Sequence, residues 1–83
     1  MKILYFAWLR ERLNMSEEDV SPPPEVVTVG GLIQWLRSRS DAADLAMQKP
    51  ELVRAAVDAR IVEHTAPLGG ARVVALFPPM TGG

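Results

Sequence analysis

The sequence predicts an α+β domain in which a mixed sheet of four to five strands carries one main helix across one face. The first and last strands, expected at 2–8 and 72–77, are the most apolar segments of the chain. Between them, a single long stripe of apolar residues with helical spacing begins after Thr28. Because the most apolar strands are those most fully buried, we expect the first and last strands to lie together at the centre of the sheet.

Length and composition limit the possible functions. The 83 residues suffice for one domain, expected to span 1–83. A net charge of −1 without a basic block gives no electrostatic footprint for nucleic acid. The absence of cysteine excludes disulfides, thiolate metal sites and a cysteine nucleophile. The apolar opening lacks a cleavage site, and no apolar run approaches the roughly 18 residues of a membrane span. We therefore expect a cytoplasmic protein without a membrane partner.

The first part of the chain is expected to form a strand at 2–8, apolar on both parities and so covered on both faces, and a short helix at 9–14. The acidic run 17–19 is interpreted as a solvated loop, because it lacks the alternating carboxylates of a calcium loop. A weak edge strand is expected around 18–21, bounded by the three prolines that follow.

The principal helix is expected to begin with Thr28 as its N-cap. Its inward stripe consists of Val29, Leu32, Ile33 and Leu36. The pair Gly30-Gly31 in the first turn could open a phosphate-binding helix, but the lysine and spaced glycines of a phosphate loop are missing. Close packing or simple tolerance is the preferred interpretation.

The second half predicts a shorter helix at 41–49, with Asp41 as a possible cap and Leu45 facing inward, closed by Pro50. Met47 is interpreted as core or rim filler. Strands are expected at 52–57 and 60–63, before the final strand. His64 is interpreted as a surface histidine, and we expect neither a metal site nor a catalytic side-chain set. Since one main helix covers only one face, the other apolar face implies a partner.

The end of the chain is the most informative segment. Pro78 and Pro79 stop the last strand and direct 78–83 into an extended tail, which could project roughly 20 Å. A frayed terminus is one interpretation. The other is a stiff lead that allows Gly82 and Gly83, which lack Cβ atoms, to enter a narrow channel in another protein and present the terminal carboxylate. The residues alone leave both interpretations open.

Taken together, these segments resemble the ubiquitin-like β-grasp sulfur carriers, most closely the family of molybdopterin synthase small subunits (the MoaD family). The matching segments are Tyr5-Phe6-Ala7, Leu9-Arg10-Glu11, Thr28-Val29 with Leu32, Ala55-Ala56-Val57, Pro67-Leu68 and Val74 to Gly83. The Phe-Pro-Pro-x-Thr-Gly-Gly ending is specific, whereas a bare Gly-Gly would not be. One departure is the turn Gly69-Gly70-Ala71-Arg72, where the family often has an acidic turn.

The resemblance implies a β-grasp fold and a role for the chain end. An E1-like adenylating enzyme would use ATP to activate the Gly83 carboxylate, and a sulfur donor would convert it to a thiocarboxylate. The tail (Pro78, Pro79, Met80, Thr81 and Gly82) would then enter the large synthase subunit, where sulfur passes to a cyclic pyranopterin precursor. A heterotetramer of two small and two large subunits is implied. The chain would hold no permanent cofactor and have no activity alone.

Partner docking is predicted at Phe6, Arg10, Ile61 and Phe77, as outward positions near the tail. Ordinary core burial is the alternative for these residues, because strand parity does not reveal which face is inside. Two rival functions also stay open. One is a thiazole-forming sulfur carrier or ubiquitin-like modifier with the same fold and terminal glycines. The other is a non-catalytic β-grasp interaction module whose end does no chemistry.

Overall fold

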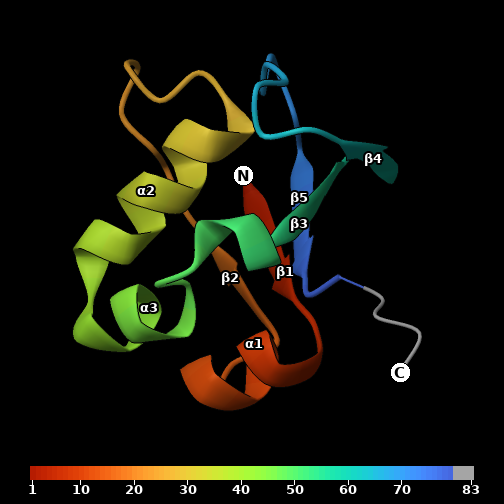
Figure 1. Cartoon of the computed structure of the whole chain (residues 1–83). Helices are drawn as coiled ribbons and strands as arrows, with labels where there is room; N and C mark the ends of the chain where they lie inside the picture. The colour runs from red at the N-terminus through yellow and green to blue at the C-terminus, as the bar shows by residue number, and fades with distance from the viewer. Residues whose placement is uncertain (80–83) are drawn as a thin grey trace.

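The computed structural model describes residues 1–79, which form a mixed five-stranded sheet with the helices on one side of it (Figure 1). The elements in chain order are β1 (Lys2–Tyr5), α1 (Ala7–Leu13), β2 (Glu17–Asp19), α2 (Val29–Arg39), α3 (Asp41–Ala46), the 3-10 turn η1 (Pro50–Leu52), β3 (Arg54–Val57), β4 (Arg60–Val62) and β5 (Val73–Phe77). The strand order is β2-β1-β5-β3-β4. The predicted α+β class is confirmed.

The two most apolar strands lie at the centre of the sheet, as predicted. β1 and β5 run parallel, from the pair Lys2–Val73 to the pair Tyr5–Leu76. β3 is antiparallel to β5 on its other side, and β2 and β4 are the edges. This arrangement places the end of β5, and so the start of the tail, inside the sheet rather than at its margin.

The first strand is shorter than predicted. It ends at Tyr5, whose amide donates to the carbonyl of Ser16, and Trp8 belongs to α1 instead. The extended backbone conformation ends at Ala7, whose φ is positive, at 53°. The expectation of burial on both faces was also wrong. Ile3 and Tyr5 are buried, whereas Leu4 on the opposite parity is only half-buried.

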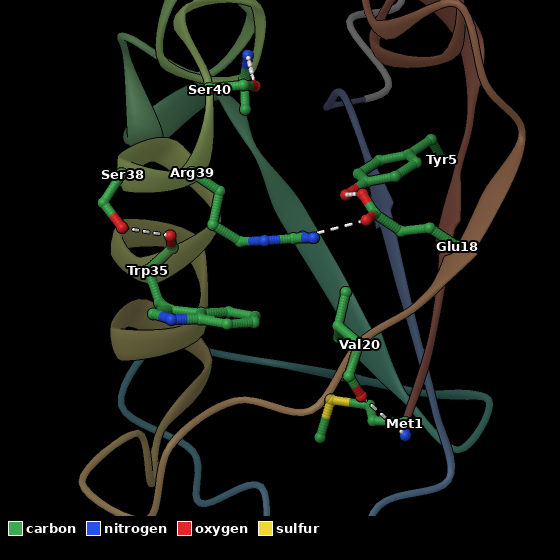
Figure 2. A network of polar contacts seen from close by, with 9 residues as sticks. Met1, Tyr5, Glu18, Val20, Trp35, Ser38, Arg39 and Ser40 are labelled. Atoms are coloured by element: carbon green, nitrogen blue, oxygen red, sulfur yellow. Dashed lines mark hydrogen bonds and ion pairs between the residues drawn. The ribbon is translucent and has the colours of Figure 1, made fainter.

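The acidic run forms the edge strand β2, which overlaps the edge strand expected around 18–21, whereas the interpretation of 17–19 as a solvated loop was wrong. Glu18 joins two elements: it accepts a hydrogen bond of 2.7 Å from the Tyr5 hydroxyl and pairs with Arg39 of α2 at 2.9 Å. Figure 2 shows Arg39 reaching across from α2 to this carboxylate, above the ring of Trp35. Burial, and next the hydrogen bond to Glu18, raise the pKa of Tyr5. The run therefore fastens β2 to the long helix.

The principal helix forms as predicted. The hydroxyl of Thr28 accepts from the Gly31 amide at 3.1 Å, and all four residues of the predicted stripe are buried. The Gly30 amide donates to the His64 carbonyl at 2.8 Å. A Cβ atom at Gly30 would lie 3.3 Å from that oxygen, so a side chain there would crowd the loop. The close-packing interpretation of this glycine is confirmed.

The second helix differs from the prediction in cap, length and phase. Ser40 is its cap, accepting from the Ala43 amide at 3.0 Å, and the helix ends at Ala46. Ala43 and Met47 are buried, whereas Leu45 is 66% exposed. Because the side chain of Ala43 is small, this side of α3 can lie close to the rest of the core. Leu45 lies on the opposite side of the helix and therefore faces solvent. The burial of Met47 agrees with its interpretation as filler.

A tight hairpin sets the register of the last three strands. β3 and β4 are joined by Asp58 and Ala59, which both have positive φ, 48° and 71°. The Asp58 carboxylate accepts from the amides of Arg72 and Val73, at 3.1 and 3.0 Å. These two hydrogen bonds hold the end of the turn Gly69-Gly70-Ala71-Arg72 in place where β5 begins. Because the register is set here, so is the face on which each strand residue lies.

Candidate docking face and tail exit

The face of the sheet opposite the core carries a continuous apolar row. Leu4, Ala75, Ala56 and Ile61 are successive partners across β1, β5, β3 and β4. Paired residues in a ladder share a face of the sheet. Ala56 is buried and the other three are half-buried or exposed, but none of the four packs with the buried side chains between the sheet and the helices. We call this row, together with Phe77 in the neighbouring register position, the docking face.

The docking face ends where the tail begins. β5 stops at Phe77, directly before Pro78, as the sequence predicts. Arg54 is the partner of Phe77 on β3. Arg54, Ile61, Phe77 and Pro79 line one hollow of about 260 Å³. The structure therefore brings two of the four predicted docking residues, Ile61 and Phe77, together beside the first residues of the tail.

The other two predicted docking residues lie on the chain segment after β1. Phe6 is 45% exposed, and its amide donates to the Leu76 carbonyl at 3.1 Å. Its extended backbone continues the alternation of β1, which places it on the same side as Leu4. Arg10 is exposed on α1. It does not line the hollow that Ile61 and Phe77 share.

The charges around the docking face are unevenly placed. At the β2 edge, Lys2 pairs with Glu17 at 3.1 Å, and the hydrogen bond and charge of Glu17 raise the pKa of Lys2. At the tail edge, Arg54 is exposed and belongs to none of the ion pairs found in residues 1–79. Within that part of the chain, an arginine without an ion pair thus lies beside the apolar side chains at the exit of the tail, and Glu51 and Glu63 line a neighbouring hollow with it.

His64 is held to the backbone rather than free on the surface. Its Nε2 lies 2.6 Å from the Val53 carbonyl oxygen, and the side chain is half-buried. It also lines a polar hollow of about 230 Å³ that reaches Pro79. Within residues 1–79, no cluster of three or more histidine, aspartate or glutamate side chains is placed to hold a metal ion. The histidine fastens its loop to the chain that leads into β3.

Sequence reasoning missed Leu4, Ala56, Ala75 and Arg54 as parts of this face. A usable signal was present: Lys2 shares the parity of Leu4 on β1 and is charged. A charged residue in a strand with one buried face marks the parity that faces solvent. The last predicted site residues, Met80, Thr81, Gly82 and Gly83, lie outside the described residues.

The parallel central pair, the long helix across one face and the apolar face leading to a tail define a small ubiquitin-like β-grasp domain. The ThiS family model matches residues 3–83, and the chain belongs to this family. The chain is 36% identical over 83 residues to the molybdopterin synthase sulfur carrier subunit of Escherichia coli, covering 100% of this chain and 99% of the relative. The predicted family and fold are confirmed.

Two solved structures have the same fold. One, from Pyrococcus furiosus, is described as a putative molybdopterin converting factor, subunit 1; it has a TM-score of 0.73 and 27% identity, and 95% of each chain is covered. The other is SAMP1 from Haloferax volcanii, with a TM-score of 0.73 and 21% identity over 100% of this chain and 98% of that one. Among residues 1–79, none of the helices is long and apolar enough to cross a bilayer.

Proposed function

We propose that this chain is the sulfur carrier subunit of a molybdopterin synthase and that the carboxyl group of Gly83 carries the sulfur. The full-length similarity to the Escherichia coli sulfur carrier subunit is the observation that carries this proposal. The geometry agrees with it, because the docking face is apolar, is not covered by a helix of the described chain and ends beside Pro79. A partner bound to this face would therefore lie next to Pro79, at the start of the tail.

The chemistry begins with activation of the terminal carboxylate, which is a poor electrophile in its free form. In the proposed sequence, a Gly83 carboxylate oxygen attacks the α-phosphorus of ATP on an E1-like enzyme, and pyrophosphate leaves. A sulfur donor at the oxidation level of sulfide then attacks the carbonyl carbon of the acyl-adenylate, AMP leaves, and a thiocarboxylate results. The thiocarboxylate sulfur bonds to the cyclic pyranopterin precursor, and water cleaves the resulting thioester, which leaves the sulfur on the precursor and returns Gly83 as a carboxylate. The enzymes that bind the tail supply the catalytic side chains, and ATP is consumed by the activating partner.

The proposed docking to the large synthase subunit uses Phe77, Ile61 and Phe6 as apolar anchors. Burial of exposed apolar area is the main driving force for association, and aromatic anchors contribute most of it. Arg54 and Arg10 would contribute charge at the rim, which favours orientation and encounter more than affinity. We further propose the heterotetramer of two small and two large subunits and a cytoplasmic location.

The composition of the tail suits insertion into a channel. Pro78 and Pro79 each fix φ, so the lead loses little conformational entropy when it is bound. Gly82 and Gly83 carry no Cβ, which allows the walls of a channel to approach the backbone. Thr81 and Met80 are the only residues with side chains between the stiff lead and the reactive end.

Intact-mass spectrometry tests the proposal directly. The chain is incubated with an E1-like adenylating enzyme, ATP and a sulfur source, and we expect a mass gain equal to replacement of one oxygen by sulfur. Fragmentation should place that gain on Gly83. A variant lacking Gly83 and a variant extended by one residue are the controls, and neither should be converted.

The rival functions give different results. A non-catalytic interaction module predicts no mass gain and full function after deletion of Gly83. A thiazole-forming carrier or protein modifier predicts the mass gain but no sulfur transfer to the pyranopterin precursor when the large synthase subunit is added. Transfer by that pair of subunits therefore separates the proposed function from its nearest rivals.

A further inference from the structure

A second apolar groove lies between α1 and α3, away from the docking face. Figure 1 shows these two helices next to each other at one end of the molecule. The groove consists of two adjoining hollows of about 360 and 460 Å³, and both are lined by Arg12, Leu45, Ala46 and Gln48. Trp8, Lys49 and Leu52 complete the wall of the first hollow. We call it the α1–α3 groove.

The walls of this groove present more apolar area than the fold needs. Leu45 is 66% exposed and Leu52 is 41% exposed, and neither belongs to the buried core. Single exposed leucines are common on protein surfaces. Here, however, two leucines and the half-buried ring of Trp8 converge on one hollow, which is typical of a binding surface.

The charge of the groove is one-sided. The Arg12 guanidinium lies over the Trp8 ring, 4.7 Å from its centroid. Neither Arg12 nor Lys49 belongs to an ion pair within residues 1–79. In that same part of the chain no acidic residue lines either hollow, although the whole sequence has 10 acidic and 9 basic residues. Two such cations at the rim of an apolar groove are complementary to an acidic occupant.

We propose that the α1–α3 groove binds a segment of a partner protein that combines an apolar side chain with neighbouring carboxylates. The apolar side chain lies against Trp8 and Leu45, and the carboxylates pair with Arg12 and Lys49. None of the residues that line the groove belongs to the docking face or to 78–83. This second recognition surface goes beyond the proposed sulfur carrier function and does not depend on it.

Selection from random displayed dodecapeptides on the immobilised full chain tests this proposal. We expect the enriched peptides to combine an aliphatic or aromatic residue with several carboxylates. The affinity of one such synthetic peptide is then measured by tryptophan fluorescence in a Trp35→Phe background, where Trp8 is the sole indole. Higher salt should weaken binding, because the carboxylates pair with exposed cations.

Matched variants locate the binding site. Leu45→Lys and Arg12→Glu should each weaken the peptide by about tenfold or more, a loss of the size expected for a central anchor or a reversed charge. Ile61→Lys on the docking face should leave the affinity unchanged. Both Leu45 and Arg12 are exposed, so the variants should fold, as circular dichroism would verify; Arg12→Gln is the milder second variant.

Several results would overturn the proposal: no enriched peptide, enriched peptides without carboxylates, or equal binding to the Leu45→Lys variant. A concentration-dependent dimer of the wild-type chain that Leu45→Lys abolishes would also overturn it, since a second copy would then be the occupant. Sulfur loading of Gly83 is measured separately, so failure here leaves the proposed function standing.

Discussion

The two faces of the sheet are both apolar, yet they have opposite roles. Leu76 and Phe77 are neighbours on β5: the first is completely buried under the helices, and the second is half-buried on the docking face. The same contrast holds on β1 for Ile3 and Leu4. Hydrophobic character alone therefore does not separate the residues that stabilise this fold from those available to a partner. The two sets of residues differ because the helices cover one face of the sheet and leave the other uncovered.

The largest expected effect on stability is on the core face. Leu76→Ala should lower the free energy of unfolding by about 2–5 kcal/mol, because it removes a buried side chain and leaves a cavity in the core. Urea denaturation followed by circular dichroism measures this loss. In a domain of this size such a loss is a large part of the total stability. A loss below about 1 kcal/mol would mean that the site collapses or that the two faces are less distinct than the structure indicates.

The matched change on the docking face should affect binding instead. Phe77→Ala is expected to weaken association with the large synthase subunit by about tenfold or more, while the free energy of unfolding of the free chain changes much less than in Leu76→Ala. Isothermal titration calorimetry and urea denaturation give the two values. Val27→Ala, at an exposed apolar residue that lines neither the docking-face hollow nor the α1–α3 groove, serves as the control. If Phe77→Ala were as destabilising as Leu76→Ala, the docking face would be part of the core.

A smaller effect on stability is expected at the turn of Asp58 and Ala59, which joins β3 to β4 and sets their register. Ala59 has a φ of 71°, a conformation that costs a residue with a Cβ roughly 1–2 kcal/mol and glycine little. Ala59→Gly should therefore raise the free energy of unfolding by about 1 kcal/mol. Ala42→Gly, within α3, should lower it by a similar amount. If both variants lost stability, backbone strain at Ala59 would not control the stability of this turn.

The smallest effect under ordinary conditions concerns Tyr5, and it is visible only in alkali. Burial and the hydrogen bond to Glu18 raise the pKa of Tyr5 above its usual 10.0, so the folded state holds this proton more tightly than the unfolded state. The stability that this provides is complete below the pKa of the unfolded chain and declines as the pH rises above it. Tyr5 is the only tyrosine, so phenolate absorbance reports it alone.

Absorbance at alkaline pH should show no tyrosinate in the folded chain at the pH where the urea-unfolded chain is half-ionised. Glu18→Gln should lower the pKa of Tyr5 without returning it to the usual value, because burial is the larger cause. A folded chain that ionises together with the unfolded one would show that the core face admits water at this position.

Several features were correctly predicted from sequence because their causes are local. The stripe of α2 and the hydroxyl cap of Thr28 depend on helical spacing and on a hydrogen bond within one turn. The end of β5 at Phe77 depends on the prolines that follow. The tail chemistry proposed for Gly83 also rests on composition at the chain end, but it stays a prediction, because residues 80–83 lie beyond the described part.

The wrong predictions share a different cause. The phase of α3, which exposes Leu45, depends on how closely Ala43 and Met47 approach the rest of the core. Glu18 was interpreted as solvated because its partners, Tyr5 and Arg39, are distant in sequence. Both outcomes are set by contacts between segments, which no local window contains.

The sequence by itself determined that this chain has an apolar strand near each end, one long amphipathic helix and two consecutive prolines that stop the last strand. Only the tertiary structure decided which parity of each strand meets the helices and which forms the docking face. Alternation along a strand divides its side chains into two sets, but the choice between the sets depends on register and helix packing across the whole sheet. For the same reason, the groove between α1 and α3 could be recognised only after the fold had placed Trp8 beside Leu45.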